Sequence, residues 1–167
     1  KFDNQIALRC DAGGDPEFRE FLRRVRETVR GALANDALLF ERILGELQLE
    51  RNASYNSIFQ VMFDYEERPL EGMEASGLRF SPQEIHNQTC KLDLRLHLEK
   101  TAQGISGWFE YSTALFDEGR IARMAQHFET LLDAVVQNPE RRLSTLPLLP
   151  EHELQKVLVE WNATDRE

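Results

Sequence analysis

The chain has 167 residues, the size of one domain or of one large subdomain. Hydrophobic residues make up 41% and charged residues 29%, a globular composition that excludes an intrinsically disordered protein. The net charge of −9 disfavours a general nucleic-acid binder, because phosphate binding needs a basic surface, and no apolar run approaches the ~20 residues that a membrane helix requires.

The first part of the chain predicts a strand and an amphipathic helix. Residues 4–10 alternate apolar and polar side chains, which indicates a short strand. Asp15 and Pro16 are typical of an N-cap followed by proline at the first helical position, and apolar spacing extends the helix over 16–34. Arginines occupy its other face, which we interpret as a solvated surface paired with glutamates rather than a patch for an anion or a carrier protein. These charged residues are Arg19, Arg23, Arg24, Arg26, Arg30, Glu17, Glu20 and Glu27.

The middle of the chain predicts a second helix followed by strands. The helix covers 39–47, and the strand after it, 57–65, carries apolar residues on both faces, which is typical of an interior strand. A polar loop is expected from Pro69 to Gly77. Residues 91–99 alternate leucine with polar side chains, and we expect them to form a hairpin with a strand over 105–112.

The last part of the chain predicts a long helix, a connector and a final helix. Asp117 can cap the long helix, whose apolar stripe continues until Asn138 and Pro139 end it. Residues 143–150 contain two prolines and are expected to be extended, and apolar residues at helical spacing follow over 154–161. These elements predict an α/β or α+β two-layer fold, with amphipathic helices covering a sheet.

The side chains alone reveal no catalytic or metal-binding motif. The histidines are isolated, so the spacing of metal ligands along a helix is absent. His97 lies on the polar face of its strand and is interpreted as a surface residue rather than a base, and His127 as a hydrogen-bonded helix histidine. Cys10 and Cys90 are expected to be reduced structural thiols, since neither has a histidine at zinc-finger spacing.

Three segments resemble, in order and spacing, the later motifs of condensation domains from nonribosomal peptide synthetases. The family patterns are F-V-N-T followed by R, then H/N-Q-D-Y-P-F-E, then R-D-x-S-R-N-P-L-F. The matching residues are Phe2, Asn4, Arg9, Asn35, Phe40, Glu41, Arg51, Ser54, Asn56 and Phe59. The segments between and after them are also similar to the family, so the resemblance covers essentially the whole chain.

The resemblance implies a chloramphenicol-acetyltransferase-like half-domain with a mixed sheet covered by amphipathic helices. We expect residues 1–142 to be the C-terminal subdomain of a condensation domain, and 143–167 to be a linker with a short helix that leads to an adenylation domain. A full domain of this family forms an amide bond between acyl groups that carrier proteins hold as thioesters on 4'-phosphopantetheine. The family's active-site histidine pair belongs to the N-terminal half and does not occur in this sequence, so we expect no catalytic residue here and no activity of the chain alone.

The resemblance also implies supporting roles for residues of this chain. Arg9 would pair with the aspartate of the missing histidine motif. The alternative interpretation is that Arg9 lies at the solvated end of a strand. Asn56 would face the tunnel near the reacting groups, and the alternative interpretation is that it is a turn residue. Arg51 is another tunnel or motif position and is interpreted as a structural residue. The remaining tunnel or motif positions are Phe2, Asn4 and Ser54.

The implied partners are the N-terminal half of the condensation domain, a donor and an acceptor carrier protein, and an adenylation domain, with no directly bound cofactor, nucleic acid or membrane. No signal-peptide pattern is present, so a cytoplasmic location is expected. Separated from its other half, the chain should expose an apolar seam, which makes a dimer or a domain swap plausible.

Three alternatives stay open. The first is an epimerization or heterocyclization domain of the same superfamily. The second is a non-catalytic module that recruits a partner enzyme, which fits the motif departures at Asp3, Gln5, Leu39, Tyr55 and Ser57. The third is an unrelated interaction domain.

Overall fold

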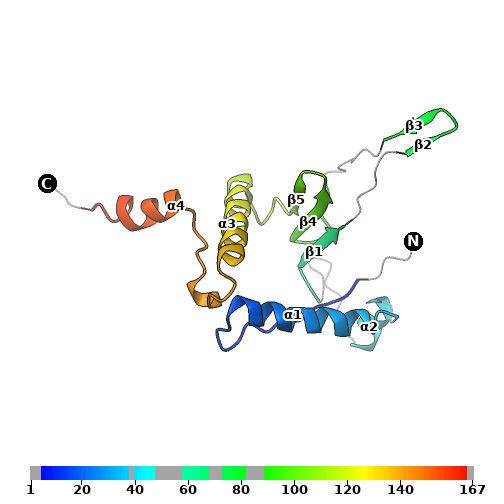
Figure 1. The fold of residues 1–167 in the computed structure, drawn as a ribbon, viewed down its shortest axis with the longest axis horizontal. Helices are drawn as coiled ribbons and strands as arrows, with labels where there is room; N and C mark the ends of the chain where they lie inside the picture. Colours follow the sequence, from blue (N-terminus) through cyan, green and yellow to red (C-terminus); the bar gives the residue numbers. More distant parts are fainter. Residues whose placement is uncertain (1–4, 38–39, 48–57, 68–72, 82–88, 165–167) are drawn as a thin grey trace. The chain divides into compact units, whose positions relative to one another are not determined.

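The computed structural model describes residues 5–37, 40–47, 58–67, 73–81 and 89–164 (Figure 1). The chain divides into two compact units. The helical unit consists of Lys1–Gln48 and Glu118–Glu167, and the sheet unit consists of Leu49–Asp117. Among the described residues, no helix combines the length and the apolar character needed to span a bilayer.

Two long helices dominate the helical unit, and both were predicted. They are α1 (Phe18–Leu33) and α3 (Glu118–Gln137), and α3 ends directly before the Asn-Pro pair. The shorter helices are α2 (Phe40–Glu46), the 3-10 helix η1 (Leu143–Thr145), α4 (Glu151–Gln155) and the π-helix η2 (Lys156–Glu160). Because η1 is helical, only the second part of the 143–150 connector is extended. The buried apolar side chains are Phe40, Ile121, Ala134 and Val135, so α2 and α3 supply the core of this unit.

The start of the chain differs from the prediction. Residues 5–10 are described and form no strand. Asp15 does not cap α1, which begins two residues later than predicted. The first N–H groups of α1 instead donate to carbonyls of the loop after α3, from Phe18 to Arg141 at 2.8 Å and from Arg19 to Pro139 at 2.9 Å. Main-chain partners distant in sequence therefore satisfy the donors that a side-chain cap would otherwise satisfy.

Asp15 caps a different helix. Its carboxylate accepts hydrogen bonds from the Ser144 N–H at 2.9 Å and the Ser144 hydroxyl at 2.8 Å, at the start of η1. Arg142 donates to the Asp15 carbonyl at 2.9 Å. These bonds offset the cost of the left-handed backbone of Asp15, whose φ is 47°. The hydrogen bonds from Ser144 also lower the pKa of the Asp15 carboxyl.

Three strands form the main sheet of the sheet unit, in the order β1–β4–β5. β1 (Val61–Glu66) runs parallel to β4 (Leu94–Thr101), and β4 runs antiparallel to β5 (Gly104–Tyr111). The predicted hairpin is therefore confirmed. Within the described part of the chain β1 pairs on one side only, so it is an edge strand here, whereas an interior strand was predicted.

A second hairpin lies where a polar loop was predicted. It consists of β2 (Met73–Ala75) and β3 (Leu78–Phe80). Its turn residues, Ser76 and Gly77, have φ values of 51° and 78°. Positive φ at both central positions is the type I′ geometry that joins two antiparallel strands with their natural twist. The sequence signal for this hairpin is the Ser-Gly pair between the two three-residue segments that form β2 and β3.

The register gives the main sheet an apolar face and a polar face. Leucines of β4 share the apolar face with Val61, Phe63 and Tyr65 of β1, which remain 62%, 61% and 48% exposed. Ile105 of β5 is 66% exposed. An exposed apolar surface was expected for a separated half-domain, while a dimer or swap stays a prediction.

Candidate functional site

Most of the predicted supporting residues have no described structure. Those that lie outside the described residues are Phe2, Asn4, Arg51, Ser54 and Asn56. Arg9 is described, is exposed and lies in a segment without regular structure. It has no ion pair within the part of the chain that the structure describes. Its pairing with an aspartate therefore stays a prediction.

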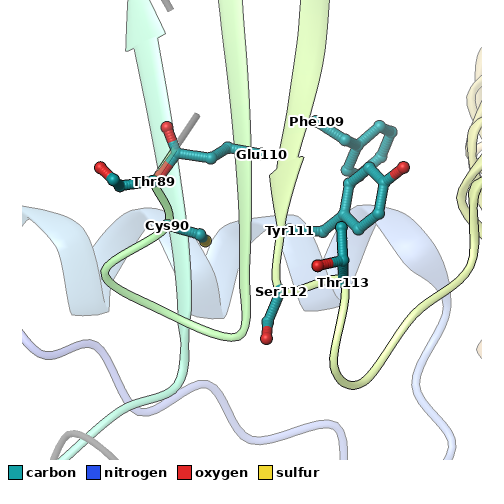
Figure 2. A pocket seen from close by; sticks show the side chains of 7 residues that line it. All are labelled: Thr89, Cys90, Phe109, Glu110, Tyr111, Ser112 and Thr113. Atoms are coloured by element: carbon teal, nitrogen blue, oxygen red, sulfur yellow. The ribbon is translucent and has the colours of Figure 1, made fainter. Parts of the chain in front are cut away.

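A pocket of about 380 Å³ opens where β5 ends, beside the segment that precedes β4 (Figure 2). Figure 2 shows Phe109 and Tyr111 on one side of this pocket and Thr89 and Cys90 on the other. The lining residues are Thr89, Cys90, Phe109, Glu110, Tyr111, Ser112 and Thr113. They include no histidine or lysine, and the one group among them that could act as a base is the Glu110 carboxylate.

The thiol in this pocket is poorly suited to nucleophilic chemistry. Cys90 Sγ lies 2.6 Å from the Leu92 carbonyl oxygen. Burial raises the pKa of the Cys90 thiol, and the nearby Glu110 carboxylate raises it further. Reactive cysteines need the opposite environment, because the thiolate is the nucleophile. Cys10 is exposed and Cys90 is half-buried, and neither forms a disulfide among the described residues. That both thiols are reduced stays a prediction.

The polar face of the main sheet carries a connected cluster from all three strands. Arg95 donates to Asp64 with an Nε–Oδ2 distance of 2.5 Å, and both side chains are 33% exposed. The Arg95 guanidinium lies 5.3 Å from the Trp108 ring centre, and the His97 ring stacks on the same tryptophan at 5.0 Å. This cluster was not predicted, because the sequence does not show how β1 aligns with β4.

His97 has a packing role in this cluster. Its Nδ1 is buried and has no hydrogen-bond partner among the described residues. A general base needs a group that orients its ring and a position within reach of the proton that it removes. Stacking on Trp108 orients the ring, but no described group accepts from or donates to Nδ1. His97 was interpreted as a surface residue, whereas it is half-buried because its ring packs on Trp108.

His127 is hydrogen-bonded, as predicted. Its Nε2 on α3 lies 2.7 Å from Oε2 of Glu153 on α4. His127 therefore links two helices that are separated by the loop, η1 and the connector.

The arginine face of α1 is largely paired within the chain. Arg23 contacts Glu20 at 2.8 Å and Glu27 at 2.6 Å, and Arg24 contacts Glu20 at 3.1 Å. Hydrogen bonds from these two arginines lower the pKa of Glu20 to about 2. Arg19 pairs with a glutamate after α3 rather than with one on its own helix. Most of this face is thus a network of surface ion pairs, as interpreted from the sequence.

The described residues contain no complete catalytic constellation. Across the described ranges, no three His, Cys, Asp or Glu side chains are grouped to hold a metal ion. The clusters that are present stabilise a sheet face, a helix surface and a helix–helix contact.

Residues 1–158 match the family model described as the condensation domain. The chain is 46% identical over 166 residues to a linear gramicidin synthase of Brevibacillus parabrevis. That alignment covers 98% of this chain but only 3% of the synthase. The chain thus spans a small fraction of the length of this curated relative.

Two solved structures have a similar fold. One is the complex of the X-domain and OxyB from teicoplanin biosynthesis, with 30% identity and a TM-score of 0.75 over 89% of this chain and 33% of that chain. The other is a four-domain nonribosomal peptide synthetase bound to AMP and glycine, with 24% identity and a TM-score of 0.73. The second alignment covers 86% of this chain and 12% of that chain.

Proposed function

The chain belongs to the condensation domain family, and we propose that it is the C-terminal half of a nonribosomal peptide synthetase condensation domain. Its α/β fold is of the chloramphenicol-acetyltransferase-like type of that family. The observation that carries the proposal is the family match over 158 of the 167 residues. In this proposal residues 1–142 form the half-domain and 143–167 form the linker to an adenylation domain.

The full domain would join two acyl groups held as thioesters on the 4'-phosphopantetheine arms of a donor and an acceptor carrier protein. The acceptor amine attacks the donor thioester carbonyl, the thiolate leaves, and an amide forms. Holding both arms in one tunnel makes the attack effectively unimolecular. The histidine that would orient or deprotonate the amine belongs to the N-terminal half.

Arg9 would hold the catalytic loop of the other half in shape. Its guanidinium is exposed and lies in an irregular segment, so it is available to a partner. A guanidinium binds a carboxylate through two parallel N–H donors, which fixes the geometry better than lysine would. Arg9 is thus a positioning residue in this proposal, not a catalytic one.

Asn56 would line the tunnel. Its amide can donate a hydrogen bond to the carbonyl oxygen that gains charge as the amine attacks. Phe2, Asn4 and Ser54 would line the same region, and Arg51 would support it. These roles rest on the motif matches.

An assay with loaded carrier proteins tests the proposal. We would compare the chain alone with the intact condensation domain of the same synthetase and detect the amide by mass spectrometry. The intact domain should form product and the chain alone should form none, because it contains no adjacent histidine pair. An intact domain that forms no amide with any loaded pair would contradict the proposal.

A second candidate function is the recruitment of a partner enzyme by a non-catalytic domain of the same fold. The observation that favours it is the 30% identity to an X-domain that was solved in complex with OxyB. A pull-down with the intact domain would separate the two candidates. Retention of a tailoring enzyme, together with no condensation, would favour recruitment.

A further inference from the structure

The contact between α3 and α4 is a largely buried, charged link between segments far apart in sequence. His127 Nε2 lies 2.7 Å from Glu153 Oε2, and the two residues are 26 positions apart. The two side chains are only 23% and 16% exposed. The other ion pairs described in the chain are between more exposed groups, so this link loses less strength to solvent.

Positive groups surround the Glu153 carboxylate. The hydrogen bond from His127 is the main cause that lowers the pKa of Glu153, and the charges of His127, His152 and Arg123 contribute further. Glu153 is therefore ionised at neutral pH. Arg123 on α3 and His152 on α4 act on the carboxylate through their charge, whereas His127 makes the hydrogen bond.

The segment that Glu153 anchors has few visible attachments of its own. It consists of α4 and η2, residues 151–160, and it follows the connector 146–150, which contains Pro147 and Pro150. The first N–H groups of α4 bond locally, to the Pro150 carbonyl at 3.0 Å.

Most apolar side chains in and just after this segment remain exposed, whereas Val157 is half-buried. Their exposed fractions are 38% for Leu154, 60% for Leu158, 51% for Val159 and, just after η2, 65% for Trp161. A helix held by few buried apolar contacts opens at low free-energy cost. One charged link can therefore decide whether the segment is docked.

We propose that the hydrogen bond between His127 and Glu153 holds the helical segment 151–160, here called the strap, against α3. When this hydrogen bond breaks, the strap moves away from α3 by rotation about the connector 146–150. A hydrogen bond to an ionised carboxylate is stronger than one between two neutral groups, and both side chains of this pair are largely shielded from solvent. This inference goes beyond the proposed function and does not depend on catalysis.

Hydrogen–deuterium exchange of an intact condensation domain that contains residues 1–167 tests the strap. After correction for intrinsic exchange, Glu153→Ala and His127→Ala should speed exchange of residues 151–160 roughly 10- to 100-fold, as expected for loss of a hydrogen bond to a charged group. The amides of α3 should keep their protection in Glu153→Ala. His152→Gln is the matched control and should change exchange less than twofold, since His152 does not contact the carboxylate directly.

A conservative variant separates loss of the hydrogen bond from general destabilisation. His127→Gln keeps a side-chain donor for the carboxylate, so its protection of 151–160 should lie between that of the wild type and that of His127→Ala. Wild-type exchange in both alanine variants, or loss of α3 protection in Glu153→Ala, would each overturn the inference.

Discussion

Gly107 on β5 occupies a position where even one methyl group has no room. It pairs with Leu98 on β4. A Cβ built on Gly107 would lie 2.4 Å from the His97 carbonyl oxygen and 2.4 Å from Leu98 Cδ2. The leucine methyl can rotate away, but the carbonyl belongs to the main chain of the neighbouring strand. Gly107→Ala must therefore push β4 and β5 apart beside the ring stack of His97 on Trp108.

Two opposing effects determine how much Gly107→Ala changes the free energy of unfolding. Overpacking costs about 1–3 kcal/mol, while replacing glycine in a strand gains roughly 0.5–1 kcal/mol by reducing the freedom of the unfolded chain. The net loss is at most about 2.5 kcal/mol and centres near 1 kcal/mol. For a domain of 150–250 residues, a loss of about 1 kcal/mol lowers the Tm by roughly 2–4 °C.

Thermal unfolding of the intact domain measures this loss, and Gly31→Ala on α1 is the matched control. Nothing lies within 4 Å of a Cβ built on Gly31. Alanine should therefore raise stability there by about 0.5–1 kcal/mol through helix propensity. If Gly107→Ala melts at or above the wild type while Gly31→Ala behaves as expected, the close approach of the two strands is wrong.

Two further predictions concern the start of the chain. Asp15→Asn should lower the Tm at neutral pH, because the Ser144 hydrogen bonds favour the ionised carboxyl. These bonds lower the pKa of Asp15 in the folded state, so their contribution is present above the usual value of 3.8 and is lost as the pH falls through the folded pKa. The Tm values of wild type and variant should therefore converge as the solution is acidified below pH 3.8. A constant difference in Tm from pH 7 to pH 2 would argue against the cap. Arg9→Ala in the intact domain should slow condensation or lower the Tm, and unchanged turnover together with an unchanged Tm would remove Arg9 from the site.

The regular periodicity of the chain was enough to predict the long helices and the β4–β5 hairpin. The alternating leucines of 91–99 indicate a strand with one apolar face, and the apolar stripe after Asp117 indicates an amphipathic helix. Asp15 shows where local reasoning fails, because its motif is that of an N-cap, yet its carboxylate bonds to Ser144, 129 positions away. The two partners are too far apart in sequence for a local motif to include both.

The candidate site was predicted by motif resemblance rather than by side-chain chemistry. Isolated histidines and the absence of a nucleophile–base motif in the sequence argue against a reactive centre, and this stays a prediction. The Asp64–Arg95–Trp108 cluster could not be predicted, because a parallel strand pair has no turn that fixes its register. The α1 ion pairs were predictable, because they lie three or four positions apart on one helix.

In the function proposed here, this chain supplies the scaffold of an amide-forming domain and the reactive histidine lies on a separate half. The decisive experiment is complementation of the two purified halves, with loaded donor and acceptor carrier proteins and mass-spectrometric detection of the amide. We predict product only when both halves are present, and none when the histidine pair of the N-terminal half is replaced by alanine. Amide formation by this chain without the other half would contradict the claim.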